Sequence, residues 1–205
     1  MSRGSPLESL AKAILIGDRS EALQTLGRAI EAGFGVEEIV VKCVLKAHID
    51  FGEWYERDPA GSLKAWDSCF LTSIKVLKVL ESKIGVPEKP PFSVLVAAVK
   101  GEGHITTRDL IALLLKAKGL NVYNSKRGIL LEDISQVLSD PSLKFVILTC
   151  TEEATKSTID TLIKGIRDTR PDVKIIAGGS FSGSVDADKV LSDPLRLCDT
   201  LFAFF

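Results

Sequence analysis

Hydrophobic residues repeat with a helical period through the first part of the chain. In "PLESLAKAILIGD", the apolar side chains of Leu7, Leu10, Ala11 and Ile14 recur three or four positions apart, which places them on one face of a helix. Three more segments of this kind follow, and glycine, aspartate or proline ends each of them. They cover residues 19–33, 35–58 and 62–85. We therefore expect a bundle of four helices joined by short turns.

The pattern changes after residues 86–91, "VPEKPP", where three prolines in six positions indicate a stiff, extended linker. From residue 92 onward, short runs of β-branched and other apolar residues alternate with helical segments. The five expected strands are "FSVLVAAV", "LNVYN", "KFVILT", "VKIIAGG" and "DTLFAFF", the last of which closes the chain. The four expected helices between them cover residues 107–119, 129–140, 153–170 and 184–193.

This alternation is typical of an α/β domain with a doubly wound, mostly parallel sheet that helices cover on both faces. The predicted organisation is a helical bundle over residues 1–85, the linker over 86–91, and an α/β domain over 92–205. In such sheets, ligands bind outside the carboxyl ends of the strands, where the strand order reverses. Functional side chains are therefore expected in the segments that follow the strands.

Composition narrows the possible classes of protein. The formal net charge is −1, so the sequence has no general nucleic-acid footprint. Its apolar runs are shorter than a membrane span, and its first residues contain no signal-peptide core, so we expect neither membrane insertion nor secretion. The four cysteines form no closely spaced pair and lie mostly among apolar residues, which indicates buried thiols in a reducing cytoplasm.

The first expected strand ends in "VKGEGHITTRDL", which contains one of the two histidines of the chain. Gly101 and Gly103 permit a close approach between backbone and ligand. Glu102 lies two positions before His104, so it could accept the proton of one imidazole nitrogen while the other nitrogen binds a metal. The alternative is a solvent-exposed histidine in a polar loop. The segment is not a dinucleotide-binding fingerprint, because Thr106 occupies the position of the third glycine.

The third and fourth expected strands also end in residues that suit a ligand. In "LTCTEEAT", a hydroxyl of Thr149 or Thr151 could point at a ligand, although Thr151 or Thr155 could instead cap the next helix. In "IIAGGSFSG", Gly178 and Gly179 leave room for a flat or bulky group against the backbone, or form a flexible turn. Three permissive strand ends at one edge of a parallel sheet predict a pocket for a large ligand, with a histidine at its mouth.

The two-domain layout and these strand ends resemble the cobalamin-binding proteins of corrinoid methyltransferase systems and the related module of methionine synthase. Those proteins combine a four-helix cap with a flavodoxin-like domain, and the resemblance covers nearly the whole chain. Their signature is Asp-x-His-x-x-Gly, then Ser-x-Leu, then Gly-Gly. Glu102-Gly103-His104 matches its start with an acid that is one methylene longer, but Thr107 stands in place of the glycine. Thr-Cys-Thr at residues 149–151 replaces Ser-x-Leu, and Gly-Gly is retained at residues 178–179.

The resemblance implies a function and a role for each of these residues. The chain would bind cobalamin as the methyl-carrier subunit of a methyltransferase system rather than act as a complete enzyme. His104 would be the lower ligand of the cobalt, and Glu102 would tune the proton of its imidazole. The other residues that would contact the cofactor are Gly103, Thr107, Thr149, Thr151, Gly178 and Gly179. Methyltransferase subunits or a reductive activator would be the partners.

The resemblance also implies a role for aromatic residues of the third and fourth helices. The helical cap would cover the upper face of the cofactor and shield its methyl group. The candidates for this contact are Phe51, Trp54, Trp66 and Phe70. Packing in the core of the helical bundle is the alternative for each of them.

Two departures from the resemblance leave other functions open. Family members continue past the fifth strand into a last helix, whereas this chain is expected to end on that strand. "LFAFF" would then be exposed apolar surface that could bind a partner or a second copy of the chain. Thr107 adds a branched side chain where the resemblance implies room for the nucleotide tail of the cofactor. The alternatives are a cobalamin- or haem-binding sensor of the antirepressor type and a cofactor-free scaffold.

Overall fold

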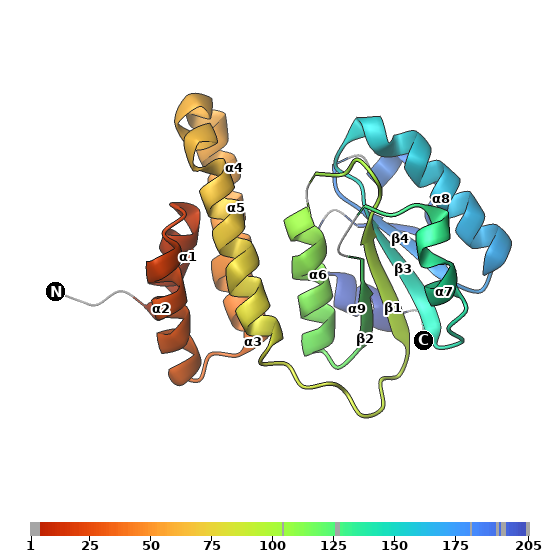
Figure 1. The fold of residues 1–205 in the computed structure, drawn as a ribbon, viewed down its shortest axis with the longest axis horizontal. Helices are drawn as coiled ribbons and strands as arrows, with labels where there is room; N and C mark the ends of the chain where they lie inside the picture. The colour runs from red at the N-terminus through yellow and green to blue at the C-terminus, as the bar shows by residue number, and fades with distance from the viewer. Residues whose placement is uncertain are drawn as a thin grey trace. The chain divides into compact units, whose positions relative to one another are not determined.

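The computed structural model describes residues 5–103, 105–125, 128–180, 182–191, 193 and 196–203. The chain divides into two compact units, Met1–Gly85 and Val86–Phe205. The first unit is helical, and the second contains the sheet (Figure 1). No helix in these described ranges is both long and apolar enough to cross a membrane.

The first unit is built from helices, as the period of its apolar residues predicts. Its elements are α1 (Pro6–Leu15), α2 (Arg19–Glu31), α3 (Val36–Ile39), the π-helical segment η1 (Val40–Leu45), α4 (Lys46–Arg57) and α5 (Pro59–Glu81). α3, η1 and α4 follow one another without a break, so they correspond to the third expected helix. Aspartates begin two of the helices, because the carboxylates of Asp18 and Asp58 accept the backbone N–H groups of Glu21 and Gly61 at 3.0 Å.

An aromatic cluster joins α4 to α5. The ring of buried Phe51 lies edge-on to those of Trp54, Trp66 and Phe70, with centroids 5.7, 5.3 and 6.0 Å away. Trp66 and Phe70 stack with their centroids 4.5 Å apart. Rings in these arrangements attract one another beyond the effect of burying their area. Phe51 is therefore a core residue of the helix pair, while the other three rings remain partly exposed.

His48 lies beside this cluster and is held in its neutral form. Its Nε2 is 2.9 Å from Ser73 Oγ, and its ring centroid is 4.8 Å from that of Phe70. The Ser73 hydroxyl donates to the Cys69 carbonyl at 3.0 Å, so the serine oxygen accepts the imidazole N–H. Burial lowers the pKa of His48 to about 4, because an imidazolium would lose hydration at this position.

We expect this histidine to reduce the free energy of unfolding by about 3 kcal/mol as the pH falls from 7 to 4. The unfolded imidazole takes up a proton below its ordinary pKa of 6.5, whereas the folded one stays neutral down to about 4. Its contribution to stability is therefore complete above pH 6.5 and is lost on acidification. Urea denaturation at several pH values gives the free energy of unfolding of the wild type and of His48→Gln as a function of pH. The difference between these two curves should change on acidification, and curves that stay parallel would contradict the prediction.

Three of the four cysteines are buried free thiols, as the sequence indicates. Burial raises the pKa of Cys43 to about 12 and that of Cys69 to about 11, and it also raises the pKa of Cys150. Because the thiolate is the reactive form, these side chains behave as small hydrophobic groups.

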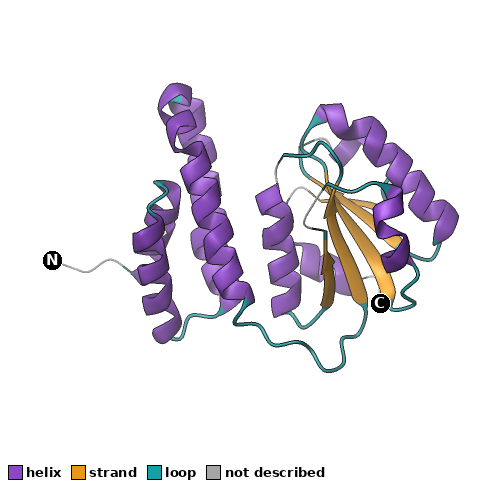
Figure 2. Cartoon of the chain, in the orientation of Figure 1, coloured by secondary structure: helices purple, strands orange, loops and turns teal. Residues whose placement is uncertain are grey.

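The second unit contains one sheet of five parallel strands, as predicted. The strands are β1 (Ser93–Ala98), β2 (Asn121–Asn124), β3 (Leu143–Thr149), β4 (Lys174–Gly178) and β5 (Lys189–Leu191). Their order is β2-β1-β3-β4-β5, and every neighbouring pair is parallel. This is the flavodoxin-like order, in which the chain reverses its direction of winding between β1 and β3. Figure 2 shows the strands as one sheet with helices on either side of it.

Helices cover both faces of this sheet, which confirms the predicted fold class. They are α6 (Ile105–Ala117), α7 (Ser135–Leu138), α8 (Lys156–Thr169) and α9 (Leu197–Phe202), with short 3₁₀ turns η2 (Leu131–Ile134), η3 (Glu153–Thr155) and η4 (Ser182–Ser184). Apolar side chains of α7 and α8 pack on one face. Those of α6 and α9 pack on the other face. The core of this unit therefore has two layers, separated by a sheet in which β1, between β2 and β3, is buried along its whole length.

The C-terminal part of the chain differs from the sequence prediction. "DTLFAFF" was expected to be the fifth strand, but the structure places α9 at Leu197–Phe202. The fifth strand is β5, within the segment expected to be a helix. A short apolar run does not distinguish strand from helix by its period, and a three-residue edge strand shows almost no alternation. Leu197 and Leu201, four positions apart, are buried against the sheet, as on one face of a helix.

This correction removes one departure from the resemblance, the missing last helix. A last helix does follow the fifth strand, so the expectation that the chain ends on a strand is wrong. The proposed contact with a second copy through an exposed C-terminal strand loses its basis, because Leu201 is fully buried in a helix. Phe204 and Phe205 lie outside the described residues.

Residues 129–140 also differ from the prediction of a single helix. Ile129 extends the sheet instead: its N–H donates to Ala98 O at 2.9 Å, and its carbonyl accepts the Lys100 N–H at 3.1 Å. The helical part is reduced to η2 and α7. Gly128 permits this approach, because a Cβ there would lie 2.7 Å from Lys100 Cα. The loop after β1 is thus held in place by the segment that follows β2.

Candidate functional site

The carboxyl ends of β1 and β3 form the candidate site. β1 leads toward α6 on one face of the sheet, whereas β3 leads through η3 into α8 on the other face. Adjacent parallel strands whose connections leave on opposite faces create a crevice at their carboxyl ends. The described residues of the two loops at this crevice are 99–103 and 150–155.

Glu102 joins these two loops. Its side chain is 7% exposed, and Oε2 accepts the backbone N–H groups of Thr151 at 2.8 Å and Glu152 at 3.3 Å. Oε1 accepts the hydroxyl of Thr151. Hydrogen bonds to a charged acceptor are stronger than neutral ones, so Glu102 holds the chain where it leaves β3. Thr155 directly precedes α8 and occupies its N-cap position. Its hydroxyl donates to Glu152 O at 2.7 Å instead of accepting a backbone N–H of the helix.

Gly178 and Gly179 bring the end of β4 against the end of β3. The N–H of Cys150 donates to Gly178 O at 2.7 Å. Gly179 has a φ of +112°, and a Cβ at this position would lie 2.5 Å from Cys150 O and 2.9 Å from Thr151 Cγ2. Only glycine fits this approach at position 179, so Gly179 is required by packing as well as available to a ligand.

A cavity of about 150 Å³ opens beside these glycines, between α6, the ends of the strands and α9. The residues that line it are Thr107, Ile111, Ile147, Thr149, Thr151, Ile176, Gly178, Gly179, Leu191 and Leu197. The structure thus brings together two threonines from the third strand end, two glycines from the fourth, and Thr107 from α6. We call this space the tail cavity.

The tail cavity contains a buried polar group, the hydroxyl of Thr149. Thr149 is 1% exposed, and its Oγ1 has no hydrogen-bond partner among the described residues. A buried hydroxyl without a partner costs about 1–3 kcal/mol, so such groups are rare in native proteins. A ligand that enters the cavity and accepts this hydroxyl would remove that cost.

The remaining predicted site residues belong to the loop after β1. Gly101 has a φ of +98°, and a Cβ there would lie 3.4 Å from Thr155 Cγ2, so this loop approaches the one after β3. Gly103 approaches it too, since a Cβ there would lie 3.9 Å from Glu152 Oε1. His104, the predicted cobalt ligand, lies outside the described residues.

Comparison with known proteins agrees with this architecture. The monomethylamine corrinoid protein of Methanosarcina barkeri superposes with a TM-score of 0.79 at 15% identity, over 96% of each chain. A cobalamin-binding protein of Desulfitobacterium hafniense DCB-2 gives 0.52 at 14% identity, over 97% of this chain and 98% of the other. The methanol:cobalamin methyltransferase complex MtaBC of M. barkeri gives 0.51 at 17% identity, over 99% and 81%. The chain has the fold of corrinoid-binding proteins. No protein-family model and no curated protein matches its sequence.

Aliphatic residues of the tail cavity were missed at the sequence level, although part of the signal was present. Ile147 and Ile176 each lie two positions before a predicted site residue, so strand alternation places them on the same face. Ile111 lies four positions after Thr107 and therefore shares its helix face. Leu191 and Leu197 were not recognisable, because the C-terminal elements that carry them were assigned incorrectly.

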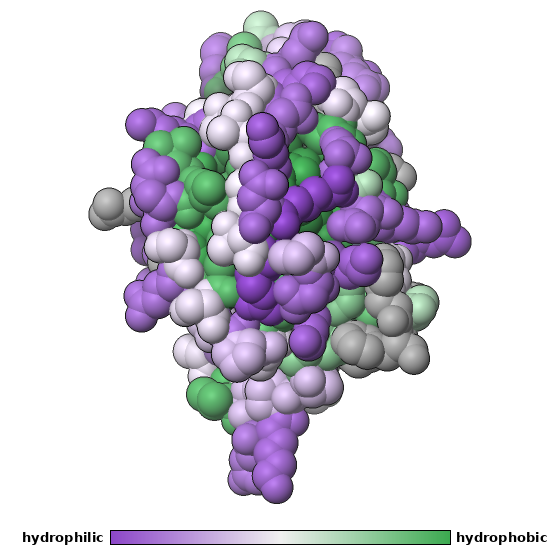
Figure 3. All heavy atoms as spheres, turned by 90° about the vertical axis from the view of Figure 1, so that its right-hand side faces the viewer, coloured by the Kyte–Doolittle hydropathy of each residue, from purple (hydrophilic) through white to green (hydrophobic). Residues whose placement is uncertain are grey.

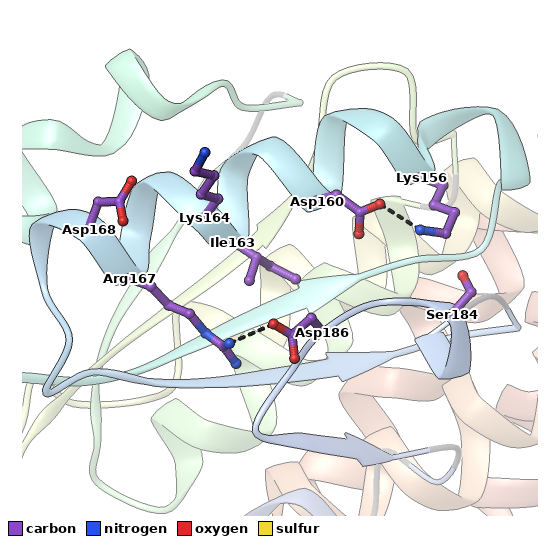
Figure 4. A pocket seen from close by; sticks show the side chains of 8 residues that line it. All are labelled: Lys156, Asp160, Ile163, Lys164, Arg167, Asp168, Ser184 and Asp186. Atoms are coloured by element: carbon purple, nitrogen blue, oxygen red, sulfur yellow. Dashed lines mark hydrogen bonds and ion pairs between the residues drawn. The ribbon is translucent and has the colours of Figure 1, made fainter.

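A second, more open concavity of about 500 Å³ lies along α8. It is on the side of the sheet that α7 and α8 cover, where hydrophilic side chains predominate (Figure 3). Two ion pairs occupy it, Lys156 Nζ to Asp160 at 2.5 Å and Arg167 Nη1 to Asp186 at 2.7 Å (Figure 4). Its other charged side chains, Lys164 and Asp168, carry opposite signs. Because the positive and negative charges of this concavity balance and four of them form ion pairs, the tail cavity remains the better candidate for a ligand.

Proposed function

We propose that this chain binds a corrinoid and carries methyl groups within a methyltransferase system. The observation that carries the proposal is the buried, unpartnered hydroxyl of Thr149 in the tail cavity, at the edge of the sheet where ligands bind. Proteins named as corrinoid or cobalamin-binding share the fold, which supports the choice of ligand class.

The tail cavity fits one arm of such a cofactor rather than the whole macrocycle. Its volume of about 150 Å³ lies below the range of roughly 300–1,000 Å³ for pockets that enclose a whole drug-sized ligand. Aliphatic side chains from α6, β3, β4, β5 and α9 surround it, and Thr149 Oγ1 supplies one buried donor. A slot of this kind suits a flat, mostly apolar ring with a nitrogen acceptor, and the nucleotide base of cobalamin is such a group.

We assign cobalt ligation to His104, which immediately follows Gly103 and precedes α6 in the sequence. Glu102 supports this assignment, because its hydrogen bonds to Thr151 and Glu152 fix its position before a ligand arrives. A carboxylate near a metal-binding imidazole accepts the proton of the second ring nitrogen, which sets the tautomer and raises the basicity of the first.

The corrinoid would supply a cobalt centre that accepts a methyl group and donates it. The residues of this chain would bind and orient that cofactor: Thr149 would donate to its tail, and Gly178 and Gly179 would admit the tail against their backbone. We further propose a methyltransferase as the partner, which the likeness to the MtaBC complex supports.

A visible-absorbance titration of the apoprotein with hydroxocobalamin tests the proposal. We expect saturable binding to the wild type with a spectrum typical of a nitrogen ligand to cobalt, and loss of that signature in His104→Gln. His48→Gln is the matched control, because it changes the other histidine of the chain and should leave the spectrum as in the wild type.

The outcomes of this titration are distinct. No binding of hydroxocobalamin by folded wild-type protein would contradict the proposal and favour a cofactor-free scaffold. Saturable binding of haem without binding of corrinoid would point to the sensor function instead. An unchanged spectrum in His104→Gln would mean that the chain binds the corrinoid but that His104 is not the ligand of its cobalt.

A further inference from the structure

A cluster of polar side chains lies beneath the N-terminal half of α6. Arg108 is 2% exposed and lies three and four positions before Ile111 and Ala112, on the face of α6 that packs against the sheet. Its Nε and Nη2 donate to Asp109 Oδ1 at 3.0 and 2.7 Å. Asn124, the last residue of β2, donates through Nδ2 to the same oxygen at 3.0 Å. One carboxylate oxygen thus fixes both the guanidinium and the amide.

Two atoms of this cluster have no hydrogen-bond partner. Within the described ranges, three buried side-chain atoms lack such a partner: Arg108 Nη1 and Asn124 Oδ1 of this cluster, and Thr149 Oγ1 of the tail cavity. All three belong to the carboxyl edge of the sheet, because Asn124 and Thr149 end β2 and β3, and Arg108 lies in the first turn of α6. Buried polar groups are normally paired, so three orphans at one edge point to a ligand that reaches beyond the tail cavity.

The chemistry of the two atoms restricts what satisfies them. Arg108 Nη1 is a donor and Asn124 Oδ1 is an acceptor, and each belongs to a side chain bonded to Asp109 Oδ1. A primary carboxamide offers an acceptor oxygen and a donor NH₂ side by side, which matches both. A carboxylate does not, because it would face Asn124 Oδ1 with a second acceptor and add a negative charge near Asp109.

We propose that Arg108 and Asn124 form a subsite for a primary carboxamide at the periphery of the corrin ring. The inference rests on the proposed function, since it names where that cofactor's amide arms would bind. Thr107 and Ile111 line the tail cavity, whereas Arg108 lies against the sheet beside β2, so α6 contributes to both places. A corrinoid that spans the carboxyl edge of the sheet would place its nucleotide in the tail cavity and an acetamide or propionamide arm against Arg108 and Asn124.

Equilibrium binding measured by absorbance with two tail-free corrinoids tests this subsite. Cobinamide carries primary amides around the ring, and cobyrinic acid carries carboxylates at the same positions. We expect the wild type to bind cobinamide at least tenfold more tightly than cobyrinic acid. Arg108→Leu and Asn124→Leu should each bind cobinamide about tenfold more weakly than the wild type does, as expected for one lost hydrogen bond. Each variant should therefore show a smaller preference for cobinamide over cobyrinic acid. Thermal melting by circular dichroism establishes that each variant is folded.

A third variant locates the effect. Thr149→Val removes the orphan hydroxyl of the tail cavity, so it should weaken binding of cobalamin more than binding of cobinamide, which has no nucleotide. Equal cobinamide affinity in the wild type, Arg108→Leu and Asn124→Leu would overturn the subsite while the proposed function stands, with water then satisfying both atoms. No binding of either cobalamin or cobinamide by the folded wild type would overturn both.

Discussion

Gly179→Ala should lower the free energy of unfolding by at least about 2 kcal/mol and weaken binding in the tail cavity. The φ of +112° is unfavourable for alanine, and the new Cβ would lie 2.5 Å from Cys150 O. That carbonyl cannot move away easily, because the N–H of the same residue is bonded to Gly178 O at 2.7 Å. Relief of the clash would push the end of β4 away from the end of β3 and deform the wall that both strands contribute. Urea denaturation and titration with hydroxocobalamin measure the two effects.

Gly183→Ala is the matched control for this change. A Cβ at Gly183 would meet no atom within 4 Å, and its φ is not positive, so alanine should change stability by less than about 0.5 kcal/mol. Similar stabilities for Gly179→Ala and Gly183→Ala would show that the two strand ends are not in close contact in solution.

Glu102→Ala should lower the free energy of unfolding by about 2–3 kcal/mol. The change leaves the N–H groups of Thr151 and Glu152 and the Thr151 hydroxyl without their shared acceptor in a partly buried place. The segment after β3 should then open more often, so the amide hydrogens of these two residues should exchange faster than in the wild type. Denaturation and hydrogen exchange followed by NMR measure these changes, and neither needs a bound cofactor.

Glu153→Ala separates this effect from the loss of a charge. Glu153 is exposed and lies one position beyond Glu152, so its removal should leave both stability and exchange nearly unchanged. Thr151→Val removes one of the three hydrogen bonds that Glu102 accepts from Thr151 and Glu152, and it should cost about 1 kcal/mol. If Glu102→Ala proves no more harmful than Glu153→Ala, the carboxylate does not hold the end of β3.

Long segments with a clear period were predictable from the sequence. The face of α1 that carries Leu10 and Ile14 is buried as expected, and so is the strand that ends at Thr149. The third, fourth and fifth strands differ in how clearly the sequence pattern predicts them, because they differ in length. β3 spans seven residues and β4 five, whereas β5 spans three at the edge of the sheet, too few for alternation to be visible.

The candidate site was predictable only in part. The threonines and glycines at the ends of β3 and β4 stand out in the sequence, because strand ends in a parallel sheet are where ligands bind. Arg108 and Asn124 did not stand out, since an arginine and an asparagine near a predicted helix or turn are normally solvated. They are exceptional because Arg108 is buried on the inner face of α6 and because Oδ1 of Asn124, at the end of β2, is a buried atom without a hydrogen-bond partner.

The sequence by itself determined the change from helical bundle to alternating strands and helices, because apolar period, glycine and proline are local properties of the chain. It also placed the candidate residues at strand ends. Only the tertiary structure decided which of those residues meet and which polar atoms remain unpaired. The carboxylate of Glu102 finds its donors 49 and 50 positions later, and Asn124 reaches Asp109 from another element, so these partnerships depend on how distant segments pack.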